Sequence, residues 1–354
     1  PKLISLNQDP APYITLRHTL AIPTVYGTGT YGTYGTGRSS SMVTVASILA
    51  LMGASYALEP STSNKSKNTA ILYLADLSDD IRGIDFRESL RLLDRTCTFV
   101  AAHPVVIMHT GLGIVAEQIR NESYVRIRPS FVDVSPHFGG TRRELRHRRG
   151  NYKAMCQFWF TRIFDVAFVA RLDYYLRLDT DSKLTCFPST GDPFAVVSGR
   201  IYGYVAVHVD PPSVVRNLTA FAVRAEAGLS LPRARASDRR IHSWHHNDMD
   251  AIPELCPFPL FYNNFEVVYV PWFCRPNVRA LASAVDATGM IYSSRWGDAP
   301  LRFLTLSLFA TIDDLVCLGG DFHYVHHGHQ HKCLNKTALV ETLGIRSTRV
   351  GCVP

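Results

Sequence analysis

The segment from residue 70 to residue 111 constrains the fold most, because two apolar runs flank a helical pattern. AILYLADL (70–77) is an apolar run bounded by polar residues, which predicts a buried strand. FRESLRLLDRTC (86–97) has helical spacing, and FVAAHPVVIMHTG (99–111) predicts a second strand, although Pro104 argues against strand in its first half. A strand, a helix and a strand in this order predict a βαβ unit and a parallel sheet.

The rest of the chain continues this mixture of strands and helices. Helices are expected over 152–170 and 300–315, strands over 173–181 and 263–274, and a helix, a turn and an extended segment over 278–293. Residues 211–255 are polar and irregular. The chain of 354 residues can bury a sizeable core, so we expect one large α/β domain over 70–354.

The first seventy residues differ from this domain. Residues 1–41 include the Gly/Thr/Tyr repeat VYGTGTYGTYGTG and are expected to be disordered. Residues 42–58 form an apolar run that ends in Ser-Tyr-Ala, which favours a signal peptide or a signal anchor over a buried helix. The polar segment 59–69 is typical of a stem.

Charge and cysteine usage limit the classes of function. The formal net charge is +7, and an arginine-rich segment lies at 141–153, but neither zinc-finger spacing nor an aromatic RNP pattern accompanies it, so a nucleic-acid partner is not expected. Eight widely spaced cysteines without a CxxC pair are compatible with disulfides in an oxidising compartment. Sequons at Asn64, Asn121, Asn217 and Asn335 point the same way.

The stretch DYYLRLDTD places Asp179 and Asp181 after an apolar strand. Two like charges so close repel each other unless a third group neutralises them. Strand ends of open α/β sheets bind ligands, and paired carboxylates can hold a divalent cation that bridges a diphosphate. A solvated turn is the alternative.

Three other features carry candidate site residues. Glu266 lies in an apolar strand, which indicates either a polar pocket or a satisfied salt bridge. Five histidines lie within 323–333, of which one could join a metal site while the others occupy a polar surface loop. In RWGDAP (295–300), Arg295, Trp296 and Asp298 offer an aromatic face and charges of the kind that bind sugars, or else form a structural turn.

Taken together, five blocks resemble one family. YKAMCQFW (152–159), DYYLRLDTDSKLTC (173–186), NNFE (263–266), TGMIYSSRWGDAPLRFLTLSLF (288–309) and YVHHGHQHKC (324–333) occur in the order of the fungal Kre2/Mnt1-type α-1,2-mannosyltransferases, glycosyltransferase family 15. The resemblance covers about residues 150–335, and 190–255 diverges. At the metal strand Asp179 stands where the family has Glu, and Thr180 where it has Pro.

This resemblance implies a GT-A-like mixed sheet flanked by helices, and a role for each matched residue. It assigns Asp179 to the metal, with Asp181 compensating for its shorter side chain. His326 is the favoured metal histidine, and His327 remains open. The resemblance places Glu266 near the anomeric carbon, with Tyr152 as the alternative, and sugar contacts at Arg177 and Asp298.

The resemblance also implies an activity: retaining transfer of mannose from GDP-mannose to a mannose hydroxyl of a glycoprotein glycan, with Mn²⁺ as cofactor. It further implies a type II membrane protein of the Golgi lumen, anchored by 42–58 unless that segment is cleaved. Two alternatives remain open: a retaining glycosyltransferase with another donor or linkage, and an inactive carbohydrate-binding relative.

Overall fold

The computed structural model describes residues 67–77, 80–138, 148–187, 189–228, 258–318, 322–326 and 329–331. The predicted low-complexity segment 1–41, the apolar segment 42–58 and most of the stem lie outside these ranges. Within them, every helix is too short or too polar to cross a bilayer.

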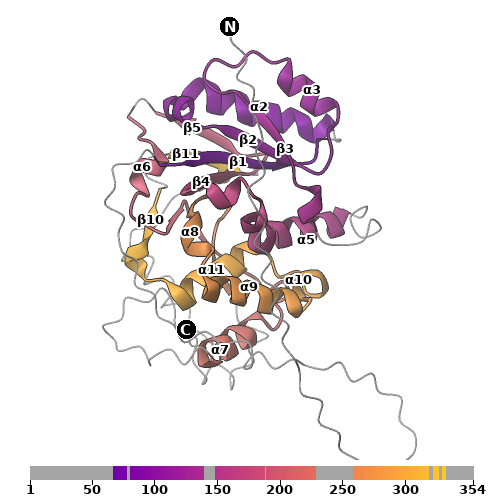
Figure 1. Cartoon of the computed structure of the whole chain (residues 1–354), viewed down its shortest axis with the longest axis vertical. Coiled ribbons are helices and arrows are strands. Elements are labelled where there is room, and N and C mark those ends of the chain that lie inside the picture. The colour runs from indigo at the N-terminus through magenta and orange to yellow at the C-terminus, as the bar shows by residue number, and fades with distance from the viewer. Residues whose placement is uncertain are drawn as a thin grey trace, which may run out of the picture. The chain divides into compact units, whose positions relative to one another are not determined.

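A seven-stranded sheet forms the centre of the fold, in the order β10-β6-β9-β4-β1-β2-β3 (Figure 1). Its strands are β1 (Thr69–Ala75), β2 (Val105–His109), β3 (Ser130–Asp133), β4 (Tyr174–Leu178), β6 (Tyr202–Tyr204), β9 (Phe265–Tyr269) and β10 (Leu315–Cys317). β1 pairs in parallel with β2 and β4, β2 with β3, and β10 with β6, whereas β9 runs antiparallel to β4 and β6. The sheet is therefore mixed, with parallel pairs in the majority.

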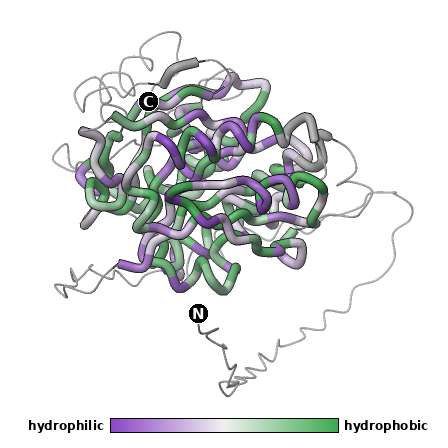
Figure 2. Tube along the Cα trace, turned by 90° about the horizontal axis from the view of Figure 1, so that it is seen from above, coloured by the Kyte–Doolittle hydropathy of each residue, from purple (hydrophilic) through white to green (hydrophobic). Residues whose placement is uncertain are grey.

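Helices cover both faces of this sheet. Figure 1 shows α2 (Asp80–Thr96) and α3 (Ile114–Arg120) on one side, and α5 (Arg148–Gln157), α9 (Pro276–Ala287), α10 (Met290–Ser293) and α11 (Asp298–Phe309) on the other. Three further helices are α6 (Pro193–Val196), α7 (Leu218–Gly228) and α8 (Val270–Phe273). Hydrophilic residues recur between the hydrophobic ones along the described tube, as expected of helices with one buried side (Figure 2).

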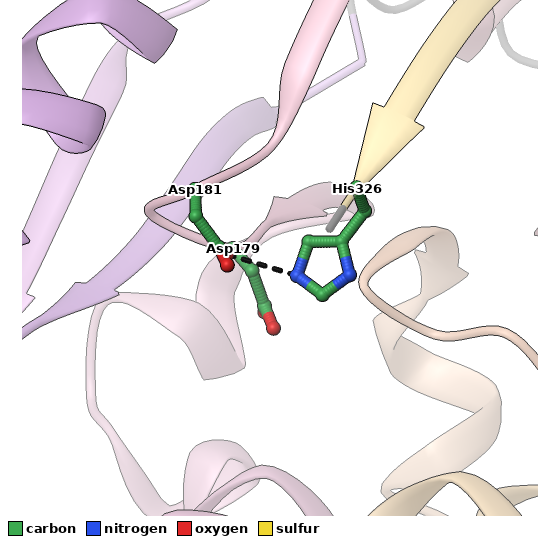
Figure 3. A group of neighbouring side chains, drawn as sticks. All are labelled: Asp179, Asp181 and His326. Carbon is green, nitrogen blue, oxygen red and sulfur yellow. Dashed lines mark hydrogen bonds and ion pairs between the residues drawn. The ribbon is translucent and has the colours of Figure 1, made fainter. Parts of the chain in front are cut away.

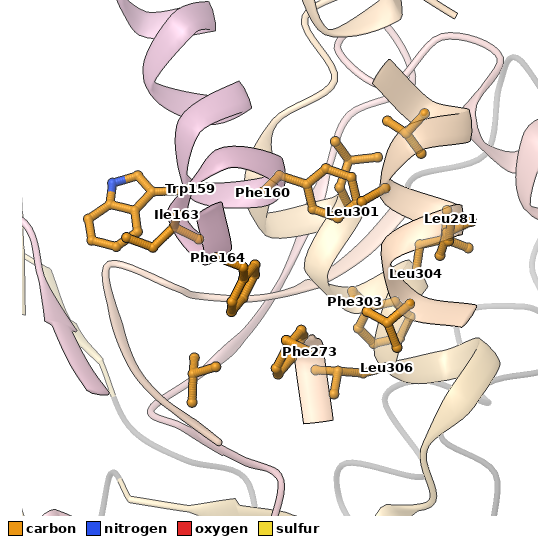
Figure 4. Close-up of a cluster of buried hydrophobic side chains, with 14 of the residues drawn as sticks. Trp159, Phe160, Ile163, Phe164, Phe273, Leu281, Leu301, Phe303, Leu304 and Leu306 are labelled. Carbon is orange, nitrogen blue, oxygen red and sulfur yellow. The ribbon is translucent and has the colours of Figure 1, made fainter. Parts of the chain in front are cut away.

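Each face of the sheet has its own core, because successive side chains of a strand point to opposite faces. In β1, Ile71 and Tyr73 pack with the buried residues of α2, whereas Ala70 and Leu72 belong to the cluster on the other face. Figure 4 shows part of that second cluster, where Trp159, Phe160 and Phe164 meet Phe273 and the leucines of α9 and α11.

Two smaller sheets are separate from the central one. β5 (Lys183–Cys186), β11 (Phe322–His326) and β12 (His329–His331) form an antiparallel sheet, and β7 (Val207–Asp210) pairs with β8 (Phe258–Phe261). A disulfide joins Cys97, just after α2, to Cys186 at the end of β5. β5 is thus tied to the helix that packs beside it.

The strand–helix–strand unit β1-α2-β2 and the strand before Asp179 are confirmed. The helix expected over 300–315 is present as α11 but ends at Phe309, and a 3₁₀ turn (Ile312–Asp314) and β10 follow it. The single helix expected over 152–170 is wrong: α5 ends at Gln157, and a π-helical turn (Phe158–Arg162) and short 3₁₀ turns follow. The bulky side chains of Phe158, Trp159 and Phe160 are all buried there, so we attribute the departure from α-helical geometry to their packing.

Other boundaries differ for local reasons. Pro104 separates a 3₁₀ turn (Thr98–Ala102) from β2, so only the second half of 99–111 is a strand. The strand expected over 263–274 ends at Tyr269, because a short helix with Pro271 in its first turn begins at the next residue. Within the irregular region 211–255 the structure contains α7, and 290–293 is helical rather than extended.

Candidate active site

A tight turn between β4 and β5 carries the two predicted carboxylates. The Ser182 backbone N–H donates to the Asp179 carbonyl oxygen at 3.0 Å, which closes the turn. The Asp179 N–H lies 3.1 Å from Ser182 Oγ and 3.2 Å from the Asn264 carbonyl oxygen. The turn is therefore fixed by its own serine and by the segment that leads into β9.

The last residue of β11 completes a candidate metal-binding cluster with these carboxylates. His326 Nε2 lies 2.9 Å from Asp181 Oδ1. One ligand atom from each of Asp179, Asp181 and His326 lies within 4.8 Å of the others (Figure 3). The structure thus brings together the three predicted ligands, and His327 lies outside the described residues.

The surroundings of the cluster suit a divalent cation. Tyr262 Oη contacts His326 Nδ1, so the other ring nitrogen, Nε2, faces the carboxylates. A metal-bound imidazole is commonly oriented in this way, by a hydrogen bond at the ring nitrogen that does not bind the metal. Burial raises the pKa of Asp179, against the lowering effects of Arg177 and His326. A cation would oppose that rise, and two carboxylates with one imidazole form a donor set that Mn²⁺ accepts.

Arg177, on β4, connects the metal cluster to Asp298. Its guanidinium is 1% exposed, donates to Asp298 Oδ2, and reaches Asp179 Oδ1 at 3.2 Å. Asn263 Nδ2 also donates to Asp298 Oδ2, at 2.7 Å. These donors hold the pKa of Asp298 low although its burial acts in the opposite direction.

A cavity of about 570 Å³ opens beside these groups. It is lined by Leu74, Asp85, Tyr152, Met155, Trp159, Arg177, Asp179, Thr180, Asp181, Asp210, Leu260, Tyr262, Asn263, Asn264, Gly297, Asp298, Ala299, Pro300 and His326. The volume is in the range of ordinary ligand pockets. Three predicted metal ligands and two predicted sugar contacts share its wall.

Tyr152, a predicted catalytic residue, also lines the cavity. Its hydroxyl oxygen lies 3.9 Å from the point where a β carbon on Gly297 would stand. Burial raises the pKa of its phenol, and the nearby Cys156 and Asp298 add to this effect. The hydroxyl therefore stays protonated at neutral pH and can donate a hydrogen bond.

Glu266, the other predicted catalytic residue, does not line the cavity. Its carboxylate is 0% exposed and accepts hydrogen bonds from Tyr202 Oη at 2.8 Å and Tyr175 Oη at 3.4 Å. Arg302 Nε lies 3.3 Å from one carboxylate oxygen, and Arg177 Nη1 lies 3.9 Å from the other. This geometry matches the satisfied salt bridge, and Glu266 meets the cavity wall only through Arg177.

Neither of the remaining two predicted sugar contacts lines the cavity. Trp296 is 2% exposed, its Nε1 donates to the Arg216 carbonyl oxygen at 2.8 Å, and its ring meets the Phe221 ring edge. It has no exposed face on which a sugar could stack. Arg295 is exposed, adopts a φ of 56°, and stacks its guanidinium over the Tyr152 ring at 5.0 Å.

Several residues that line or support the cavity were not among the predicted site residues. Asn264 donates to Asp179 and Asn263 to Asp298, so the pair of amides that precedes β9 serves both halves of the site. The doubled asparagine after an apolar strand was the available signal. No sequence signal marked Asp210 or Arg302, because the contacts of these residues depend on which strands and helices meet in three dimensions.

The mixed sheet, the cavity and the candidate metal-binding cluster leave the class of protein to be specified, and sequence comparison identifies the family. The profile of the glycolipid 2-alpha-mannosyltransferase family matches residues 135–349. The chain therefore belongs to this mannosyltransferase family, which confirms the resemblance.

Individual relatives are distant. The chain is 24% identical over 237 residues to the O-glycoside alpha-1,2-mannosyltransferase homolog 4 of Schizosaccharomyces pombe, over 57% of this chain and 54% of that protein. It is 24% identical over 192 residues to a glycolipid 2-alpha-mannosyltransferase of Saccharomyces cerevisiae, over 52% of this chain and 41% of the other. The chain spans about half the length of the curated relatives it matches.

Solved structures share the fold. The core-mannan synthase A (CmsA/Ktr4) of Aspergillus fumigatus, in a Mn/GDP form, superposes with a TM-score of 0.60 at 18% identity, over 77% of this chain and 78% of that one. The S. cerevisiae mannosyltransferase Ktr4p gives 0.59 at 18% identity, over 82% and 81%. The expected mixed sheet flanked by helices is confirmed.

Proposed function

We propose that this chain is a retaining α-1,2-mannosyltransferase that moves mannose from GDP-mannose to a mannose hydroxyl of a glycoprotein glycan, with Mn²⁺ as its cofactor. The observation that carries the proposal is one cavity wall shared by Asp179, Asp181 and His326 with the Arg177–Asp298 pair. Family membership supports it, and so does the Mn/GDP form of the CmsA/Ktr4 structure.

Asp179, Asp181 and His326 would hold the ion. When bound, the ion supplies positive charge that stabilises the departing diphosphate. Asn264 and Tyr262 orient two of the ligands, so the site is held in place before an ion arrives. The buried Arg177 fixes Asp298, which lines the cavity and would accept hydrogen bonds from the hydroxyls of a sugar bound there.

Two residues were expected to act at the anomeric carbon, and the geometry separates them. Tyr152 lies at the cavity wall with a protonated hydroxyl, whereas Glu266 stands behind Arg177. Glu266 can therefore act on a bound sugar in this conformation only by holding Arg177 in place. A direct contact with the reacting carbon would require Arg177 to move aside.

The location of the protein is part of the same proposal. The Cys97–Cys186 disulfide supports an oxidising compartment, in line with a type II protein of the Golgi lumen. Asn121 and Asn217 are exposed sequon residues that would be open to glycosylation there. A mobility shift on endoglycosidase treatment, smaller in the Asn121→Gln and Asn217→Gln variants than in wild type, tests this.

The decisive test of the activity is radiolabelled transfer from a panel of sugar nucleotides to α-mannosides, with and without Mn²⁺. We expect product only with GDP-mannose and only with the ion. Product from another donor would favour the related transferase with a different donor. Absence of product with every donor, from folded protein that still binds mannosides, would favour an inactive carbohydrate-binding relative.

A further inference from the structure

The cavity extends beyond the metal cluster to a second acidic group that the function above does not use. Asp210 is the last residue of β7, where it pairs with Phe258 of β8, and its side chain lines the cavity together with Leu260 of the same hairpin. The charged neighbours that act on it are Arg295 and Asp298, which belong to the RWGDAP turn and not to the metal cluster. Asp210 therefore marks the Asp298 end of the cavity.

Asp210 differs from the other carboxylates on the cavity wall in the hydrogen-bond donors available to its carboxylate oxygens. Asp179 accepts from Arg177 and Asn264, Asp298 accepts from Arg177 and Asn263, and Asp181 meets His326. Asp85 is exposed, so water can serve it. Asp210 is half-buried, and within the described part of the chain no group donates a hydrogen bond to it.

A carboxylate withdrawn from water without protein donors is costly unless a ligand supplies them. Burial raises the pKa of Asp210, and Asp298 adds to that effect while Arg295 opposes it. The hydroxyls of a neutral sugar are suitable donors. A diphosphate is not, because Asp210 and Asp298 would both repel it.

The apolar neighbours of Asp210 fit the same ligand. Leu260 and the Tyr152 ring lie on this wall, and a sugar presents C–H groups as well as hydroxyls. The donor's phosphates belong with the cation, and Asp210 is influenced by Arg295 and Asp298 and not by the candidate metal ligands, so we assign the sugar beside Asp210 to the acceptor. This step rests on the proposed function.

We propose that Asp210 binds the acceptor sugar by accepting a hydrogen bond from one of its hydroxyls, and that it is a determinant of acceptor specificity. A hydrogen bond to a charged acceptor that is lost on truncation corresponds to roughly a 10- to 100-fold weaker binding constant. The donor site should be nearly unaffected, because no hydrogen bond or ion pair joins Asp210 to any of the three candidate metal ligands.

The experiment measures binding of methyl α-mannoside to the full chain in the presence of Mn²⁺ and GDP, by calorimetry or ligand-observed NMR. Asp210→Ala should raise the mannoside Kd about 10- to 100-fold, while the GDP Kd changes less than about twofold. Asp210→Asn, which keeps the volume, provides a second reading if the alanine variant does not fold. Asp165→Asn, which removes an exposed carboxylate paired with Arg279, is the charge-matched control and should bind as wild type does.

Monodeoxy mannosides identify the hydroxyl. The mannoside that lacks the hydroxyl bound by Asp210 should bind weakly to wild type and equally weakly to Asp210→Ala, because the same hydrogen bond is lost in both cases. Equal mannoside affinity of wild type and both Asp210 variants would overturn the inference, and so would wild type that binds no mannoside. Transfer activity is measured separately, so a failure of mannosyl transfer with Asp210-dependent mannoside binding would refute the proposed function alone.

Discussion

Replacing Glu266 with Gln tests whether this carboxylate serves the fold or the chemistry directly. Glu266 is fully buried, and within the described part of the chain it is the only carboxylate that forms an ion pair with Arg302. Neutralising it leaves the Arg302 guanidinium with the Trp159 carbonyl oxygen at 3.0 Å, Tyr175 Oη at 3.3 Å and the Phe273 ring at 4.6 Å. None of these groups carries a compensating negative charge.

The expected cost follows from that imbalance. Removing one partner of a buried ion pair typically costs about 3–5 kcal/mol, because the other charge stays buried and uncompensated. A whole domain is stable by about 5–15 kcal/mol, so Glu266→Gln should lower the free energy of unfolding by a large fraction. Glu88→Gln removes an exposed carboxylate 3.8 Å from Arg91 and should cost less than about 1 kcal/mol.

Urea unfolding of both variants and of wild type provides the measurement, and a double variant provides the internal control. Glu266→Gln combined with Arg302→Met removes both charges and should recover much of the lost stability, because a buried pair can be replaced by apolar groups at little cost. The reasoning is refuted if Glu266→Gln unfolds like wild type while kcat falls about 10²–10³-fold. That result would place Glu266 at the transition state.

Three further perturbations give separate readings. Asp179→Asn should remove the rise in melting temperature that Mn²⁺ gives wild type and lower the transfer rate at least about 100-fold; an unchanged thermal response to the ion would contradict the metal assignment. Cys97→Ser with Cys186→Ser opens a loop of 89 residues and should cost about 4–5 kcal/mol in the free energy of unfolding, and a loss below about 1 kcal/mol would show that the bond constrains little. Burial acts to raise the pKa of Asp94, but three backbone N–H groups at 2.6–2.9 Å hold this pKa below its ordinary value. The contribution of Asp94 to the stability of the fold is therefore present above about pH 4 and is lost as the pH falls towards the lowered folded-state pKa. The stability gap between wild type and Asp94→Asn should therefore shrink in acid, and a gap that widens there would refute the assignment.

Local sequence pattern predicted those candidate site residues that directly follow a strand. Asp179 and Asp181 follow directly after β4, and the apolar run before them is readable without knowledge of the fold. His326 lies 145 positions from Asp181, so its place depended on the resemblance and not on periodicity. The sequence alone supports a strand and two carboxylates there, but not the imidazole that completes the cluster.

Buried polar partners were the part that sequence could not predict. Glu266 in an apolar strand fits a pocket or a salt bridge equally well, and only the packing of α11 against the sheet brings Arg302 to it. Trp296 was expected to face a sugar, yet α7, which lies in a region without readable pattern, contributes the Phe221 that covers it. Both outcomes depend on contacts between distant segments, which neither propensity nor period contains.

The position of β11 in the chain has a consequence for how the protein is made. All seven strands of the central sheet precede residue 318, whereas the strand that carries His326 begins at Phe322 and pairs with β5. During synthesis the large sheet can therefore assemble before the imidazole reaches the two carboxylates. A chain that stops short of Phe322 keeps the strands of the large sheet and lacks the third candidate ligand, so its affinity for Mn²⁺ should fall below that of a chain that includes β11.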